Sequence, residues 1–270
     1  MGNAEMKPII ESYNLDEEFL YEKPYLFIKG YATALGLSST LKALPLARKI
    51  HNGQYRKGEV EVNGKKYKLP YLMHVLKVCS TLISLKLPLP VEELDILLSS
   101  AILHDVIEDA PEGFFRAEGY ELVTNYGFPM EVYQVVKLVS KRSGATEEEL
   151  ASYFNDIKKN KFALLIKMAD RSHNVEDLHV MKVEKLHKYV NETRNWIYPL
   201  SSYAKANYPE LSNGVTILKA KIVSLTEETE TLTELYEEKI ANKERELSEK
   251  EKQIEELMKE LEQLKGKKDK

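Results

Sequence analysis

Apolar residues recur along most of this chain at the three- and four-residue spacing that is typical of amphipathic helices. Pro90 followed by Val91-Glu92-Glu93 marks a helix start, because proline and acidic side chains suit a first turn. Residues 94–107 are apolar on nearly every side, so we expect this helix to continue to Ile107 and to lie centrally. Thr146 before three glutamates predicts a capped helix start, and 161–174 predicts another apolar helix.

One segment alternates instead. Val60-Glu61-Val62 and Lys66-Tyr67-Lys68-Leu69 flank Asn63-Gly64, the dipeptide that favours a type I′ turn. We therefore expect a two-stranded hairpin within an insertion at 58–69. The predicted fold class is all-α, a helical bundle that carries this small β-hairpin.

The last part of the chain is highly charged and repeats apolar residues at heptad spacing, with one four-residue shift of the repeat from Tyr236 to Ile240. We expect a C-terminal coiled-coil helix that pairs as a homodimer or with a partner helix through residues 224–264. A solvated single helix is the alternative, because Lys243 and Lys250 fall on the seam. The expected domains are an N-terminal extension at 1–40, a helical domain at 41–223 and this tail at 224–270.

Composition narrows the classes of function. The net charge of −4 argues against general nucleic-acid binding, and no apolar run approaches the length of a membrane span. Cys79 is the single cysteine, so no internal disulfide can form and a cytoplasmic setting is expected. We expect neither a nucleic acid nor a membrane as partner.

The candidate chemistry centres on Ile102-Leu103-His104-Asp105-Val106-Ile107-Glu108-Asp109. An imidazole beside a carboxylate can bind one divalent cation, and on a helix Glu108 and Asp109 would lie one turn away. His74 and Asp170 extend the predicted metal set to two histidines and two aspartates, which suits Mn²⁺, Fe²⁺ or Zn²⁺. For Asp170 the alternative is an ion pair with Arg171 or a lysine. His51 supports the site or is simply packed, and Trp196 is expected in the core.

Several ordered motifs resemble one family. They are His51-x-Gly53-Gln54-x-Arg56-Lys57, Pro70-Tyr71-x-x-His74, the segment from Leu103 to Asp109, Tyr126-Gly127, and Lys167-x-Ala169-Asp170-Arg171-x-His173-Asn174. Over about residues 45–205 the chain resembles HD-domain metal-dependent phosphohydrolases, in particular the hydrolase domain of RelA/SpoT homologues. These enzymes remove the 3′-pyrophosphate of the guanine nucleotide alarmones ppGpp and pppGpp.

The resemblance implies a role for each matching residue. His74, His104, Asp105 and Asp170 would bind the metal, usually Mn²⁺, and Glu108 and Asp109 would activate water and transfer protons. Arg56, Lys57 and Asn174 would hold the nucleotide. The implied reaction is hydrolysis of the alarmone to GDP or GTP and pyrophosphate.

Two departures from the family pattern leave alternatives open. Twelve residues separate Lys57 from Pro70 and contain the predicted hairpin, and Glu176 and Asp177 follow Asn174 where charge would repel a polyphosphate. The substrate could then be another nucleotide, such as NADPH or a deoxynucleotide. A third interpretation is a nucleotide-sensing scaffold that acts through the coiled coil. No synthetase domain follows, so alarmone synthesis is not expected.

Overall fold

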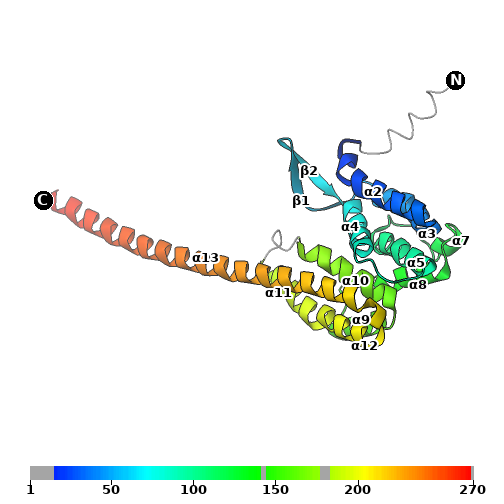
Figure 1. The fold of residues 1–270 in the computed structure, drawn as a ribbon. Helices are drawn as coiled ribbons and strands as arrows, with labels where there is room; N and C mark the ends of the chain where they lie inside the picture. The colour runs from blue at the N-terminus through cyan, green and yellow to red at the C-terminus, as the bar shows by residue number, and fades with distance from the viewer. Residues whose placement is uncertain (1–14, 141–143, 177–182, 269–270) are drawn as a thin grey trace, which may run out of the picture. The chain divides into compact units, whose positions relative to one another are not determined.

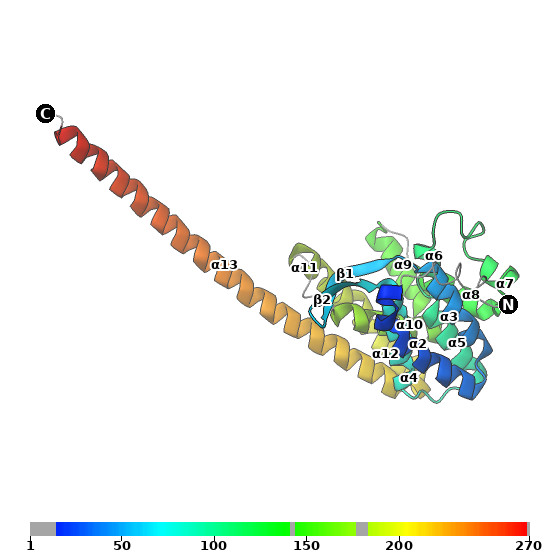
Figure 2. The ribbon, with the colours of Figure 1, turned by 90° about the horizontal axis from the view of Figure 1, so that it is seen from above.

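The computed structural model describes residues 15–140, 144–176 and 183–268, and in these residues it is a helical bundle with one hairpin (Figures 1 and 2). The all-α fold class with a small β insertion is therefore confirmed. The chain divides into two units, Met1–Val223 and Ser224–Lys270, each of which is described by itself. Asp177, one of the two acids expected near the phosphate, lies outside the described residues.

The first unit contains α2 to α12 and the start of α13. In chain order the helices and strands of the described residues are α2 (Leu15–Leu35), α3 (Ser38–Ile50), β1 (Tyr55–Val62), β2 (Lys65–Pro70), α4 (Tyr71–Ser84), α5 (Val91–Ile102), α6 (Val106–Asp109), α7 (Glu121–Thr124), α8 (Met130–Val139), α9 (Glu147–Ile157), α10 (Lys161–Asn174), α11 (Val183–Glu192), the π-helix η2 (Thr193–Ile197), α12 (Tyr198–Asn207), the 3₁₀-helix η3 (Pro209–Leu211) and α13 (Ser212–Lys268). The expected domain boundary after residue 40 falls within α3.

The core forms where α10 packs against α4, α5, α8, α9 and α12. Its apolar residues are fully buried, as shown by Leu164, Leu165 and Ile166 on α10 and by Leu76 and Ile102 on its neighbours. Burying such side chains supplies the main stabilising free energy, about 1.5–3 kcal/mol for each one. The predicted helix at 161–174 is confirmed, and its central place brings its polar C-terminal half into the interior.

The hairpin has the predicted turn. Asn63 and Gly64 both have positive φ, 52° and 76°, which is the backbone that a type I′ turn requires. Val60 pairs with Tyr67 across the antiparallel ladder, and Tyr55 pairs with Pro70 at its base. Because β2 ends at Pro70 and α4 starts at Tyr71, the hairpin leads directly into the helix that carries His74.

The helix ends agree with the predictions in some places and not in others. Thr146 and Glu149 form a capping box at α9, as predicted. The expectation of one helix continuing to Ile107 is wrong, because α5 ends at Ile102 and a turn precedes the short α6. This break matters for the site, because the side chains of adjacent residues on an unbroken helix point about 100° apart and would not face the same side.

The start of α3 is held from a distant helix. The amides of Ser39 and Thr40 donate to the Asp95 carboxylate at 2.9 and 2.7 Å, and the Thr40 hydroxyl donates to it at 2.7 Å. Leu37, the residue at the N-cap position, makes no such side-chain bond. Asp95 on α5 therefore supplies in tertiary structure the cap that the local sequence lacks.

The second unit contains the helical residues 224–268 of α13. The predicted C-terminal helix is confirmed, although it begins earlier, at Ser212. Ile240, Leu247 and Ile254 repeat at seven-residue spacing with more than half of each side chain exposed, at 56, 59 and 56%. Among the described residues, no helix combines the length and apolar character needed to cross a bilayer.

Candidate metal centre

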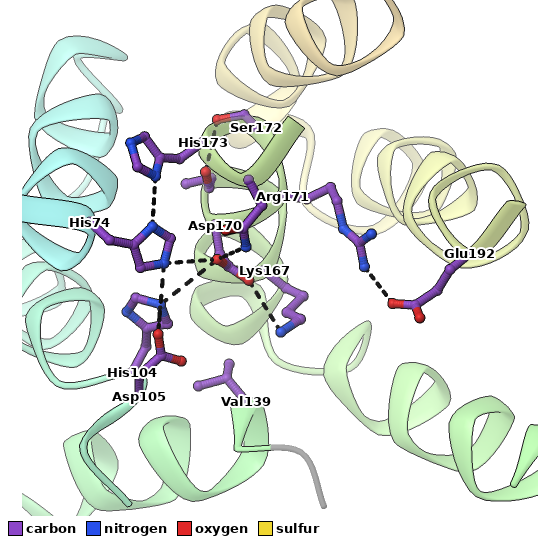
Figure 3. Close-up of polar contacts among 12 residues, drawn as sticks. His74, His104, Asp105, Val139, Lys167, Asp170, Arg171, Ser172, His173 and Glu192 are labelled. Carbon is purple, nitrogen blue, oxygen red and sulfur yellow. Dashed lines mark hydrogen bonds and ion pairs between the residues drawn. The ribbon is translucent and has the colours of Figure 1, made fainter. Parts of the chain in front are cut away.

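His74, His104 and Asp170 come from α4, the turn after α5, and α10, and their ligand atoms all lie within 4.8 Å of one another (Figure 3). The Oδ1 atom of Asp170 lies 3.2 Å from Nε2 of His74 and 3.9 Å from Nε2 of His104. All three residues are buried. We call this group, together with Asp105, the His/Asp cluster.

Asp105 reaches the His/Asp cluster because of the break after α5. Its Oδ2 atom lies 3.0 Å from Nε2 of His104 and 3.7 Å from Nε2 of His74. The Tyr71 hydroxyl donates to the same oxygen at 2.6 Å and so fixes the carboxylate. The structure thus brings the four predicted ligand residues into one buried site.

The orientation of His104 tests whether these residues suit a cation. Its Nδ1 atom lies 2.8 Å from the Ala101 carbonyl oxygen, so this nitrogen carries the proton and donates. Its Nε2 atom is buried and has no hydrogen-bond partner among the residues that the structure describes. An imidazole that is anchored at Nδ1 by a backbone carbonyl and directs Nε2 at carboxylates is the usual arrangement of a metal-binding histidine, so the donor set fits a divalent cation that displaces the Nε2 proton.

His74 is oriented by a second histidine. The Nδ1 atoms of His74 and His173 lie 2.6 Å apart and share a hydrogen bond. Burial and the nearby His74, Arg56 and Lys77 lower the pKa of His173 to about 2, so its ring is neutral and can accept. In the tautomer in which His74 donates from Nδ1, its Nε2 lone pair points at the two carboxylates.

Charges in the His/Asp cluster compensate each other. Burial alone would raise the pKa of Asp105, but His104 and His74 hold it well below its ordinary value. Lys167 lies 3.3 Å from Oδ2 of Asp170, and with His74 it outweighs burial to lower the pKa of that carboxyl. Asp170 therefore does pair with a lysine, as the alternative supposed, while its other oxygen faces the histidines.

His104 behaves differently from His74. Burial would lower its pKa, but Asp105 and Asp170 outweigh this effect and raise the pKa to about 9. Burial dominates at His74 and lowers its pKa. Without a cation, the cluster thus holds its extra proton on His104 at neutral pH.

The predicted catalytic acids lie on α6, immediately after the cluster. Glu108 is exposed, whereas Asp109 is half-buried and its amide donates to the Asp105 carbonyl oxygen at 2.9 Å. Burial and the Asp105 carboxylate raise the pKa of Asp109, which favours a group that holds and releases a proton. The Gln54 amide fixes this segment by donating to the Asp109 carbonyl at 2.6 Å.

The predicted nucleotide contacts are only partly brought together. The Arg56 guanidinium donates to Oδ1 of Asn174 at 2.8 Å, and the Asn174 amide donates to Asp170 at 2.5 Å. Arg56 and Asn174 therefore adjoin the cluster. Lys57 is exposed on β1, and no hydrogen bond or ion pair within the described residues joins it to the cluster.

One charge assignment changes in the structure. Glu176 was expected to repel phosphate, but the Lys221 ammonium lies 2.5 Å from its carboxylate, which offsets that charge. Its other oxygen lies 3.9 Å from Nε2 of His173. Glu176 thus belongs to the support behind His74, and the repulsion expected from it is weakened by its ion pair with Lys221.

Some supporting residues had no predicted role. Tyr71 and Lys167 each lie three residues before a candidate ligand. On a helix this spacing places both residues of a pair on the same face, so it would have indicated a supporting role for Tyr71 and Lys167. His51 is buried and shares a hydrogen bond with Gln54 over 2.7 Å between Nδ1 and Oε1. It reaches the site through Gln54, which agrees with a supporting role.

Comparison with curated proteins finds relatives named for (p)ppGpp hydrolysis and relatives named GTP pyrophosphokinase. The chain is 28% identical over 192 residues to the bifunctional (p)ppGpp synthase/hydrolase SpoT of Escherichia coli, covering 68% of this chain and 24% of SpoT. It is 30% identical over 165 residues to a guanosine-3′,5′-bis(diphosphate) 3′-pyrophosphohydrolase of Haemophilus influenzae, covering 58% and 21%. Over these segments the chain is similar to RelA/SpoT-type enzymes.

A third relative carries a different name. A GTP pyrophosphokinase of Myxococcus xanthus is 29% identical over 225 residues, covering 76% of this chain and 26% of the relative. The chain thus spans about a quarter of the length of these relatives. No family model matches the chain.

Proposed function

We propose that the chain is a metal-dependent phosphohydrolase that removes the 3′-pyrophosphate of guanosine tetra- and pentaphosphate, giving GDP or GTP and pyrophosphate. The observation that carries this proposal is the His/Asp cluster, in which the buried Nε2 of His104 lacks a hydrogen-bond partner among the described residues. The proposed setting is the cytoplasm. The names of the SpoT-type relatives support the substrate class.

In the proposed mechanism His74, His104, Asp105 and Asp170 hold one divalent cation, Mn²⁺ in the first instance, with Fe²⁺ or Zn²⁺ as alternatives. Such a cation lowers the pKa of a bound water and polarises a phosphoryl oxygen. Arg56 and Asn174 orient the nucleotide, and the exposed Lys57 adds positive charge at the approach. Lys167 holds Asp170 in its ionised form.

The proposed proton transfers belong to α6. Asp109 accepts a proton from the attacking water or passes one to the leaving group, for which its raised pKa is suited. Glu108, exposed beside it, is the second proposed acid. We favour hydrolysis over synthesis because a His/Asp metal set beside a carboxyl of raised pKa suits water activation, although some relatives are named pyrophosphokinases.

The decisive experiment incubates purified protein with ppGpp and Mn²⁺ and measures GDP and pyrophosphate. We expect both products in equal amounts, and none after chelation. Asp109→Asn should lower kcat by about 10²–10⁴-fold while the protein keeps its metal content. Incubation with ATP and GTP should form no ppGpp, and formation of ppGpp instead would overturn the proposal.

A second candidate substrate is another nucleotide, because β1 of the inserted hairpin itself carries Arg56 and the insertion can therefore change what fits beside the cluster. The same assay separates the two. Release of orthophosphate from NADPH or from a deoxynucleotide, with ppGpp left intact, would favour the second candidate.

We also propose that α13 pairs with a second copy of this chain, as a coiled coil. The exposed stripe of Ile240, Leu247 and Ile254 supports this, since an apolar heptad stripe on a helix gains free energy when it is covered.

A further inference from the structure

A hollow of about 600 Å³ lies between α9, η2 and α12 and shares no lining residue with the His/Asp cluster. Its volume is within the range of about 300–1,000 Å³ that is typical of small-ligand sites. Three aromatic residues, one lysine and two amides contribute to its wall: Phe154, Trp196, Tyr203, Lys158, Asn155 and Asn195. Nothing in the proposed mechanism uses this hollow.

The aromatic wall is held in a fixed position. The Trp196 ring stacks on Phe154, with centroids 5.6 Å apart and the planes within 4° of parallel. Phe154 is buried and Trp196 is half-buried, so the indole packs on the edge of the core and keeps part of its surface accessible. A half-buried indole that lines a hollow offers an aromatic surface on which a planar ring can stack.

The backbone beneath Trp196 is irregular. Residues 193–197 form a π-helix, a rare geometry that is found mainly at functional sites. It begins at Thr193, whose hydroxyl accepts from Arg171 at 3.0 Å, and Arg171 also pairs with Glu192 at 2.5 Å (Figure 3). These contacts anchor the start of the π-helix that carries Trp196.

The polar wall indicates the charge of the ligand. The Lys158 ammonium lies 5.3 Å from the centre of the Tyr203 ring, and no carboxylate among the described residues pairs with it. Its neighbour Lys159, by contrast, lies 2.9 Å from Asp156. Asn155 and Asn195 are exposed at the edge and offer both donors and acceptors, as the edge of a base does.

We propose that this hollow is a second ligand site, which binds a nucleoside phosphate with the base against Trp196, the amides at its edge and the phosphate on Lys158. The inference goes beyond the proposed function and does not depend on it. An uncharged planar ligand would not pair with Lys158, and an anion that lacks a ring would not cover the aromatic wall. A nucleoside phosphate satisfies both parts of the hollow.

Trp196 is the only tryptophan of the chain, so its fluorescence reports on this hollow directly. The 270-residue chain is titrated with GDP in a chelating buffer, which keeps the His/Asp cluster free of cations. We expect saturable quenching. Lys158→Ala should raise the Kd about tenfold, because a charge-assisted bond to phosphate is lost.

The matched control is Lys159→Ala, which removes a neighbouring lysine and should change the Kd by less than about twofold. Arg56→Ala, beside the cluster, should likewise leave the Kd unchanged. Ribose 5-phosphate, which lacks a base, should cause no quenching. Guanosine should bind weakly and equally to the parent protein and to Lys158→Ala. Circular dichroism and the emission of the unliganded protein show that each variant is folded.

Two results would overturn the inference. One is the absence of saturable quenching by millimolar GDP in the folded parent protein. The other is quenching that Arg56→Ala weakens and Lys158→Ala does not, because the signal would then come from the neighbourhood of the cluster. Neither result bears on whether ppGpp is hydrolysed.

Discussion

At the scale of single residues, the site depends on which nitrogen of each imidazole faces the carboxylates. The Ala101 carbonyl fixes Nδ1 of His104, and His173 does the same for His74, so both Nε2 atoms face the carboxylates. These outer contacts add no ligand, but they set the direction and basicity of the ligands that are present. His173 is thus a positioning residue, with Glu176 and Lys221 behind it.

Replacement of His173 tests this support. His173→Ala should weaken Mn²⁺ affinity by about 10–100-fold, because His74 loses the partner that holds its tautomer. His173→Asn should recover part of the loss, since an amide oxygen can still accept. Isothermal titration calorimetry measures both affinities.

The control is His187→Ala, a change at an exposed histidine on α11, which should leave metal affinity unaltered. Equal affinities of the parent protein and of His173→Ala would contradict the positioning role.

The pKa of His104 gives a second prediction at this scale. Asp105 and Asp170 raise this pKa to about 9 against the effect of burial, whereas His74 is already neutral because burial lowers its pKa. A cation must therefore displace one proton, from His104. Metal affinity should rise about tenfold per pH unit between about pH 7 and about pH 8.5, and binding should release about one proton.

Calorimetry in buffers of different ionisation enthalpy counts the released protons. A pH-independent affinity with no proton release would show that His104 is neutral before the cation binds.

At the scale of elements, the break between α5 and α6 is the decisive feature. A continuous helix would point His104 and Asp105 about 100° apart, whereas the turn lets their side chains approach to 3.0 Å. Gly119 packs against α6 so closely that an added Cβ would lie 2.5 Å from Cδ1 of Ile107. The short helix is therefore held by its packing rather than by its own length, which is below that of a stable isolated helix.

Asp95 provides a test of how the elements are joined. Asp95→Ala removes three hydrogen bonds from the start of α3 and should lower the free energy of unfolding by about 2 kcal/mol, since bonds to a charged acceptor are among the stronger ones. Urea denaturation measures this as a lower midpoint with an unchanged slope.

The control on the same helix is Glu92→Ala, an exposed acid of the first turn, which should cost less than about 0.5 kcal/mol. Equal effects of the two substitutions would show that Asp95 does not act as a cap.

At the scale of the whole molecule, the two units follow different physical rules. The first buries a continuous core around α10, whereas the second is a charged helix whose apolar stripe is exposed within its own unit. A helix of this kind gains little stability alone and more from a partner.

Self-association of the chain should therefore depend on that stripe. The double substitution Leu247→Asp with Ile254→Asp should convert a concentration-dependent dimer into a monomer, because it places charge at the seam. Sedimentation equilibrium measures the change in mass. Ser248→Asp, next to the stripe on an exposed position, should leave the dimer intact, and a parent chain that is monomeric at every concentration would refute the pairing.

The sequence alone determined the helical class, the type I′ hairpin, the cap at Thr146 and the helix of 161–174, because each depends on local periodicity or on residues a few positions apart. It also indicated His74, His104, Asp105 and Asp170 through motif spacing. Only the tertiary structure decided the break after Ile102, the Asp95 cap, the pairing of Glu176 with Lys221 and the hollow beside Trp196. Each of these joins residues that are distant in the chain or replaces a local preference by packing, and neither effect leaves a periodic signal in the sequence.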